Sequence, residues 1–157
     1  MILNFWHICK LEFFDQGLIQ VSNDGGVNWT PIFDGAASLA IGAIAISPSS
    51  PEIVYVGTGE ATFSGSSFFG VGVYRINNAS TTANVSGPFR LDATSADIFS
   101  GRAIGRIIVH PTNPDIIFVG STSGIGGILG NSTGLTLPSR VFTVATMLLR
   151  QHRFLQN

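Results

Sequence analysis

Two stretches of this chain repeat one another, and the repeat limits the folds that the chain can adopt. Residues 104–120 align without gaps with residues 41–57 at an offset of 63 residues, and eight of the seventeen positions are identical. Each copy contains an apolar run, a Pro-x-x-Pro turn and a second apolar run that ends in Val-Gly. Self-similarity at a fixed period, carried by short strand-like segments, is typical of a propeller or a solenoid.

Apolar runs separated by Gly, Pro, Asn and Ser predict strands throughout the middle of the chain. The expected strands cover residues 18–21, 28–33, 41–46, 53–57, 71–76 and 85–91, and the second copy starts at residue 104. The run Ile41–Ile46 is almost continuously apolar, which favours a strand buried on both faces. Gly87-Pro88 weakens the last of these strands. Each repeat unit would be a four-stranded antiparallel sheet.

A tight polar turn, Ser22-Asn23-Asp24-Gly25-Gly26-Val27-Asn28-Trp29, separates the first two expected strands. Asp24-Gly25 is a strong hairpin signal, because aspartate tolerates the turn and glycine supplies a positive φ without a Cβ clash. The pattern Ser-x-Asp-x-Gly-x-x-Trp resembles the Asp-box, or BNR repeat, of sialidases and related β-propellers. The resemblance, taken with the repeat, covers about residues 17–130.

The resemblance implies structural roles for four residues of this turn. The Asp24 carboxylate would cap backbone N–H groups, Ser22 would support the same turn, and Gly26 would supply backbone freedom. Trp29 would pack into the core of the sheet. In this family the box serves the fold and usually lies far from the active site. The second unit departs from the pattern, because Asn77-Asn78-Ala79-Ser80 stands where its box is due.

The expected fold is therefore all-β, a partial β-propeller of about two to two and a half four-stranded blades. Three segments are expected: an atypical N-terminal segment over residues 1–16, the partial propeller over residues 17–140 and an atypical tail over residues 141–157. Complete propellers close with roughly four to eight blades. The chain would then be a fragment with exposed sheet edges.

The tail, residues 141–157, does not continue the repeat. Codons can be chosen for residues 140–157 such that a frame one base earlier reads Gly-Val-Tyr-Arg-Ser-Asn-Asn-Ala-Thr. Seven of these nine residues match residues 72–80, at the place where the next strand is due. We therefore expect the tail to be an out-of-frame reading, which the nucleotide sequence would test. The alternative is an amphipathic helix, since Val144, Leu148, Leu149 and His152 fall at helical spacing.

Composition excludes several classes of function. The formal net charge is −1, so there is no polybasic surface for nucleic acid. The single cysteine, Cys9, can form neither an internal disulfide nor a cysteine-based zinc site. No apolar run is long enough to span a membrane, and the N-terminus lacks the features of a signal peptide. Charged residues make up only 11%, a composition found in many extracellular all-β proteins, so a secreted or surface parent is expected.

Candidate catalytic residues are present but form no recognisable motif. Sialidases of this family bind the substrate carboxylate with three arginines and use a Tyr–Glu pair and an aspartate. The residues available for such roles are Arg75, Arg90, Arg102, Arg106, Tyr55, Tyr74, Glu60, Asp92, Asp97 and Asp115. Glu60 begins a loop with Phe63, Phe68 and Phe69, which could present a carboxylate and stacking rings to a sugar. The simpler interpretation is an exposed loop with its rings tucked against the fold.

The remaining motifs favour structural roles. The run Gly124–Gly130 lacks the Gly-Lys-Ser/Thr ending of a phosphate loop, and His110 is a lone histidine rather than a metal site. No catalytic residue, cofactor or metal is therefore assigned. The expected function is a non-catalytic binding or structural scaffold for a carbohydrate or protein ligand. The alternative is part of a sialidase- or xyloglucanase-like glycoside hydrolase whose catalytic residues lie mostly outside this chain.

Overall fold

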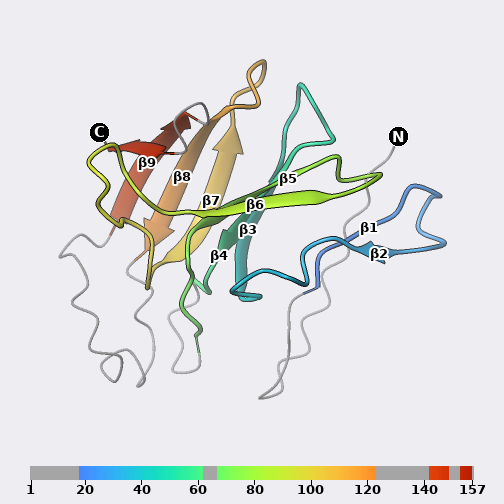
Figure 1. Cartoon of the computed structure of the whole chain (residues 1–157), viewed down its shortest axis with the longest axis horizontal. Coiled ribbons are helices and arrows are strands. Elements are labelled where there is room, and N and C mark those ends of the chain that lie inside the picture. Colours follow the sequence, from blue (N-terminus) through green and yellow to red (C-terminus); the bar gives the residue numbers. More distant parts are fainter. Residues whose placement is uncertain (1–17, 62–66, 123–141, 149–152, 157) are drawn as a thin grey trace.

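The computed structural model describes residues 18–61, 67–122, 142–148 and 153–156, and every regular element in them is a β-strand (Figure 1). The strands are β1 (Gln20–Val21), β2 (Thr30–Pro31), β3 (Ile41–Ile46), β4 (Val54–Thr58), β5 (Val73–Asn77), β6 (Asn84–Phe89), β7 (Ala103–Val109), β8 (Ile116–Thr122), β9 (Phe142–Leu148) and β10 (Arg153–Gln156). The expected all-β class is confirmed for these residues. The expected segment 1–16 and the residues Cys9, Phe63 and Gly124–Gly130 lie outside them.

The strands form one two-stranded and two four-stranded antiparallel sheets. β1 pairs with β2, and the larger sheets have the orders β3-β4-β5-β6 and β10-β9-β8-β7. Each larger sheet is therefore a meander in which strands that follow one another in the chain lie side by side. Both Gly87 and Pro88 lie within β6, an edge strand, where a missing backbone donor is tolerated.

The tail forms strands rather than a helix. Residues 142–148 pair with β8 along its whole length, and residues 153–156 pair with β9. The amphipathic-helix alternative is therefore wrong for the described part of the tail. The sequence 142–148 contains β-branched residues at Thr143, Val144 and Thr146, which suit a strand better than a helix.

The repeat seen in the sequence is also a repeat of hydrogen-bonding register. We call β3–β6 the first large sheet, or first sheet, and β7–β10 the second. In the first sheet Ala45 lies opposite Tyr55, and in the second Ile108 lies opposite Phe118, each 63 residues further on. Both strand pairs shift register at the same place, after Ile41 and after Ile104. The two units thus share their backbone pairing as well as their residues.

The turns that join these strand pairs also correspond. In the first unit Ser47 N–H donates to Ile53 O, and in the second His110 N–H donates to Ile116 O. The Ser47 hydroxyl accepts from the Ser50 N–H, and His110 Nδ1 accepts from the Asn113 N–H in the same way. His110 therefore caps its own turn.

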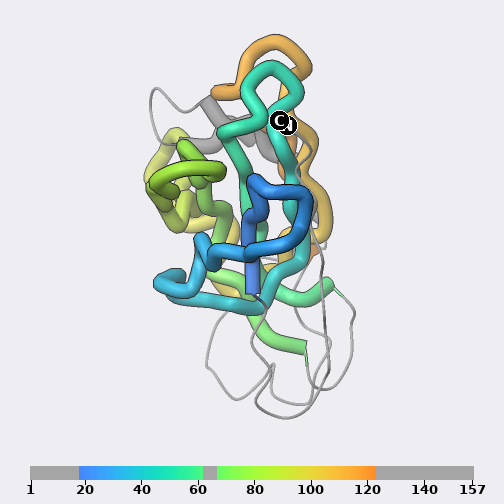
Figure 2. The backbone as a smooth tube through the Cα atoms, turned by 90° about the vertical axis from the view of Figure 1, so that its right-hand side faces the viewer, coloured from blue at the N-terminus to red at the C-terminus, as the bar shows by residue number. Residues whose placement is uncertain are grey.

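The three sheets are stacked, with β3–β6 in the middle (Figure 1). One buried cluster joins the β1–β2 hairpin to β4 and β5, and Figure 2 shows this hairpin in front of the strands that it covers. A second cluster joins the other face of β4 to β7 and β8. Val54 and Val56 belong to the first cluster and Tyr55 to the second, because successive side chains of a strand point to opposite faces.

The strand that is buried on both faces is β4, not β3. All five residues of β4 are buried, whereas β3 is an edge strand that is only partly buried, with Ile44 38% exposed. The expectation for Ile41–Ile46 is therefore wrong. Its apolar pattern reflects close contact with β7 on one side, while the short β1–β2 hairpin leaves part of its other face uncovered.

Glycines allow the two large sheets to approach closely. A Cβ atom added at Gly42 would lie 2.2 Å from the Gly59 carbonyl oxygen and 2.4 Å from that of Ile104. A Cβ atom at Gly57 would lie 2.4 Å from the Ile104 Cγ2 atom. These two glycines are part of the repeat, so the repeated motif encodes the packing of neighbouring sheets.

Candidate functional site

The turn between β1 and β2, residues 22–29, is held by its own side chains. Asp24 Oδ1 accepts from the Ser22 hydroxyl at 2.8 Å and from the N–H groups of Val27 and Asn28 at 3.1 and 3.0 Å. Asp24 Oδ2 accepts from Asn28 Nδ2 at 2.6 Å. The Ser22 oxygen accepts from the Gly26 N–H, and Gly26 has a φ of 93°. The backbone can take this path because glycine lacks a Cβ atom.

This hydrogen bonding determines the chemistry of Asp24. Bonds from the Asn28 N–H, from the Asn28 side chain and from Ser22 lower the pKa of the Asp24 carboxyl to about 2. An anion stabilised in this way is a poor proton donor or acceptor near neutral pH. The geometry suits a carboxylate that stabilises a turn.

Trp29 does not pack into the core of a sheet as expected. The indole is half-buried, its Nε1–H donates to the Gly26 carbonyl at 3.0 Å, and its ring lies against Gly26. The indole therefore closes the turn from outside. The core position beneath the hairpin is taken by Phe33, which is 1% exposed and meets Tyr74 edge-to-face at 5.1 Å.

Three of the carboxylates considered for catalysis accept hydrogen bonds from nearby backbone N–H groups. Glu60 accepts from the Phe68 N–H, and its own N–H donates to the Phe68 carbonyl. Asp92 accepts from the N–H groups of Thr94 and Ala96, and Asp97 accepts from those of Phe99 and Ser100. Phe68 is 62% exposed, so this ring is not tucked against the fold as the simpler interpretation expected.

The four candidate arginines have different surroundings. Arg75 pairs with Asp115 at 2.7 Å, and Arg90 pairs with Asp97 at 3.3 Å. Arg102 is 2% exposed, and burial lowers its pKa, whereas Arg106 is exposed on β7. A triad that binds one carboxylate needs its three forks free and convergent. Two of these arginines already hold carboxylates of the chain itself.

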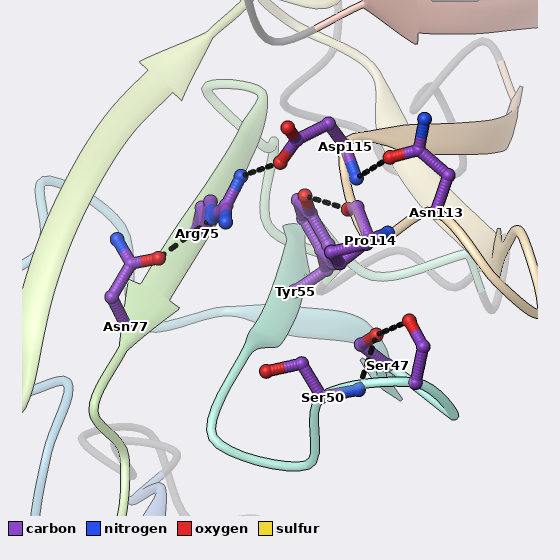
Figure 3. A network of polar contacts seen from close by, with 9 residues as sticks. Ser47, Ser50, Tyr55, Arg75, Asn77, Asn113, Pro114 and Asp115 are labelled. Atoms are coloured by element: carbon purple, nitrogen blue, oxygen red, sulfur yellow. Dashed lines mark hydrogen bonds and ion pairs between the residues drawn. The ribbon is translucent and has the colours of Figure 1, made fainter.

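A polar junction formed by Tyr55, Arg75 and Asp115 connects the two large sheets (Figure 3). The Tyr55 hydroxyl donates to the Pro114 carbonyl at 2.6 Å, and the Arg75 guanidinium donates to Asp115. The guanidinium carbon lies 5.8 Å from the centre of the Tyr55 ring, and Arg75 Nε donates to Asn77. The first sheet is thus joined by hydrogen bonds and an ion pair to the β7–β8 turn of the second.

Burial limits the chemistry of the Tyr55 hydroxyl in this junction. Tyr55 is completely buried, and burial raises the pKa of its hydroxyl to about 12. A phenol that ionises so reluctantly is a poor nucleophile near neutral pH. Sequence reasoning treated Tyr55 and Asp115 separately, as a sheet residue and a turn residue. The sequence does contain a clue: the second copy has Phe118 where the first has Tyr55, so the two copies differ at this position only by the hydroxyl group.

A hollow of about 300 Å³ lies beside the hairpin. Its lining residues are Gly35, Ala36, Ala37, Tyr74, Val85, Gly87 and Pro88. The Tyr74 hydroxyl accepts from the Ala37 N–H at 3.1 Å. The lining contains no charged side chain, so this hollow offers an apolar surface with few polar anchors.

Within the described ranges, no group of His, Cys, Asp and Glu is arranged to hold a metal ion. In the same part of the chain, no helical segment combines the length and the apolar character that crossing a bilayer requires. Comparison of the chain with protein-family models, with curated proteins and with solved structures yields no match.

Proposed function

We propose that this chain is part of an Asp-box β-propeller and serves as a non-catalytic scaffold. In this assignment β3–β6 and β7–β10 are consecutive blades, and β1–β2 is the last hairpin of a preceding blade. The observation that carries the proposal is the register repeat of 63 residues in two four-stranded meanders that pack face to face. The self-capped turn at Asp24, in the hairpin slot where the family carries its box, supports it.

The scaffold role is favoured over an enzymatic one by how the polar side chains are used. Arg75, Arg90, Glu60 and Asp97 contact other groups of the chain rather than lining a common hollow. The proposed ligand is a carbohydrate or a protein bound by a longer protein that contains these units, at the cell surface or outside the cell. A sialidase- or xyloglucanase-like parent is the alternative, with its catalytic residues outside this chain.

Two assays on the same material separate these roles. The chain, and a longer protein that contains it, are screened on a glycan array and assayed with a fluorogenic sialoside and a xyloglucan oligosaccharide. The scaffold role predicts no turnover above a heat-denatured control. Turnover by the longer protein above that control would replace the scaffold role with the enzymatic one.

A further inference from the structure

The hollow beside the hairpin arises where the first sheet extends beyond its cover. Val85 of β6 lies opposite Ile76 of β5, so the two side chains share one face of the sheet. Ile76 is completely buried in the cluster under the β1–β2 hairpin, whereas Val85 is 41% exposed. The hairpin therefore covers β5 on this face but leaves Val85, on the edge strand β6, uncovered.

An irregularity in β6 forms one wall of the hollow. The register of β5 and β6 shifts at Tyr74, so that Gly87 and Pro88 together stand opposite this one residue. A bulge of this kind bends an edge strand and is common beside functional sites. Gly87 lies against the Tyr74 ring, since an added Cβ atom would be 3.0 Å from Tyr74 Cδ1. The absence of a side chain at Gly87 thus helps to keep this wall low.

The connection between β2 and β3 forms the other wall, through Gly35, Ala36 and Ala37. These small residues leave a space of about 300 Å³ open, which is the lower end of the range of about 300–1,000 Å³ for ligand pockets. Tyr74 is the buried residue of the lining, whereas the others are partly or fully exposed. Tyr74 therefore forms the floor.

The hydroxyl group on this floor has an unused donor. Tyr74 is 3% exposed, and its oxygen accepts from the Ala37 N–H at 3.1 Å. A phenol also carries one proton that it can donate. Among the groups that the structure describes, none accepts a hydrogen bond from this hydroxyl. Because a buried donor without a partner is unfavourable, the hollow favours an occupant that brings an acceptor to Tyr74.

The lining restricts the chemistry of that occupant. It contains no charged side chain, so a charged group would lose its hydration without compensation. The hydroxyl groups of a sugar need several polar partners, and the side chains of the lining offer one. A peptide combines an apolar side chain with a carbonyl acceptor close to it. The strand beside the hollow, β6, is at the edge of its sheet, where an extended segment can lie alongside.

We propose that this hollow binds an uncharged aliphatic side chain of an extended segment of a partner protein, with a backbone carbonyl of that segment accepting from Tyr74. The inference narrows the ligand of the scaffold role proposed above to a protein. It rests on the hollow and not on the propeller assignment. A chain that binds glycans but no apolar peptide would keep the scaffold role and lose this site.

The first measurement is a nuclear magnetic resonance titration of the full, isotopically labelled chain with N-acetyl-leucine methylamide. We expect saturable shifts of the Ala36, Ala37 and Val85 methyl groups, with a dissociation constant of about 1–10 mM for so small a probe. The Ile108 methyl groups, which are also exposed but lie on the second sheet, should not shift. N-acetyl-glutamate methylamide and methyl β-glucoside should not bind.

No saturable shift at these methyl groups would overturn the proposal and would leave a hollow that holds only water. Tighter binding of the glucoside would assign the site to a carbohydrate and would also overturn it. The same shifts on concentrating the chain without a probe, together with dimerisation, would assign the hollow to a second copy. That result would contradict a partner protein as the occupant.

Two variants test the floor and the space separately. Tyr74→Phe keeps the ring but removes the donor, and it should weaken binding of the leucine probe about threefold to tenfold. Gly35→Leu should weaken it tenfold or more, roughly, by filling the hollow; its added Cβ meets no atom within 4 Å, so the fold accommodates it. Val27→Ala, at an exposed position of the hairpin turn, is the control and should bind normally. Unchanged binding in both Tyr74→Phe and Gly35→Leu would exclude this site.

Discussion

The first and second large sheets present equivalent residues to different surroundings. The first has a neighbour on each face: the hairpin covers Val54 and Val56, and the second sheet covers Tyr55. The second sheet buries Ile117 and Val119 but leaves Phe118 exposed. The repeated motif therefore specifies sheet-to-sheet packing as well as strand pairing. Position in the stack then decides which side chains contribute to stability.

The largest expected difference concerns the aromatic side chains at the equivalent positions. Tyr55→Ala should lower the free energy of unfolding by about 3–4 kcal/mol, because it leaves a large cavity between two sheets. Phe118→Ala should cost about 1 kcal/mol or less, because its ring is partly in water. Urea denaturation followed by circular dichroism measures both. Equal losses would mean that the two positions have equal burial in solution.

The glycines of the repeat give the next effect. Gly42→Ala should destabilise the chain by about 2–3 kcal/mol, because the added methyl meets two backbone carbonyl groups that cannot move independently. Gly105→Ala is the matched control, since the nearest atom to its added Cβ is the Ala61 methyl at 3.5 Å. That variant should be neutral or stabilising by up to about 1 kcal/mol. A neutral Gly42→Ala would show that the sheets are further apart than described.

The Tyr55 hydroxyl provides a smaller and more specific comparison. Tyr55→Phe places in the first sheet the same side chain that Phe118 provides at the equivalent position of the second. It leaves the Pro114 carbonyl without its hydrogen-bond donor. The expected cost is about 1 kcal/mol, the usual net value of such a hydrogen bond. The reciprocal change Phe118→Tyr should be close to neutral, because its hydroxyl can reach water. If thermal denaturation gives the same stability for Tyr55→Phe and the wild type, the hydrogen bond from Tyr55 to Pro114 does not stabilise the fold.

The smallest effect concerns the two hairpin turns and their pH dependence. Asp24 caps its own turn, whereas the β5–β6 turn is held from outside by Glu52, which accepts from the Ser80 hydroxyl and N–H. The pKa of the Asp24 carboxyl is lowered to about 2. The pKa of the Glu52 carboxyl is also lowered, mainly because it accepts a hydrogen bond from the Ser80 hydroxyl. Their stabilisation is therefore present above the unfolded-state pKa and is lost as the pH falls.

For Asp24 this loss should fall between about pH 4 and pH 2. Amide exchange of Val27 and Asn28, compared in the wild type and in Asp24→Asn, measures it. The wild-type amides should lose protection over this interval, and those of the variant should be weakly protected throughout. Protection that is unaffected by pH in the wild type would exclude the carboxylate as the cap.

Strands and their pairing could be predicted because the repeat compares two copies of the same local pattern. The positions of β3, β4, β7 and β8 follow from near-continuous apolar runs, the Pro-x-x-Pro turn and the terminal glycine. The sequence did not predict which face of each sheet is covered by a neighbouring sheet. The pattern of Ile41–Ile46 suggests burial on both faces, but burial depends on which sheets lie beside it.

Some of the polar contacts could likewise be predicted from the sequence, and others could not. The cap at Asp24 could be predicted, since its partners lie within four residues in the chain. The junction of Tyr55, Arg75 and Asp115 could not, because its members come from separate strands and from a turn of the next unit. The resemblance to the Asp-box placed Trp29 in the core, but its N–H has a partner within the turn and Phe33 fills the core. The out-of-frame origin of residues 141–157 stays a prediction for the nucleotide sequence.

Face-to-face stacking of the two large sheets brings Gly57 of the first sheet against Ile104 of the second. Nuclear Overhauser effects in the isotopically labelled chain measure this directly. We expect a strong effect between the Gly57 α-protons and the Ile104 γ2 methyl group. Absence of the Gly57–Ile104 effect in a folded sample would contradict the face-to-face stacking of the two units.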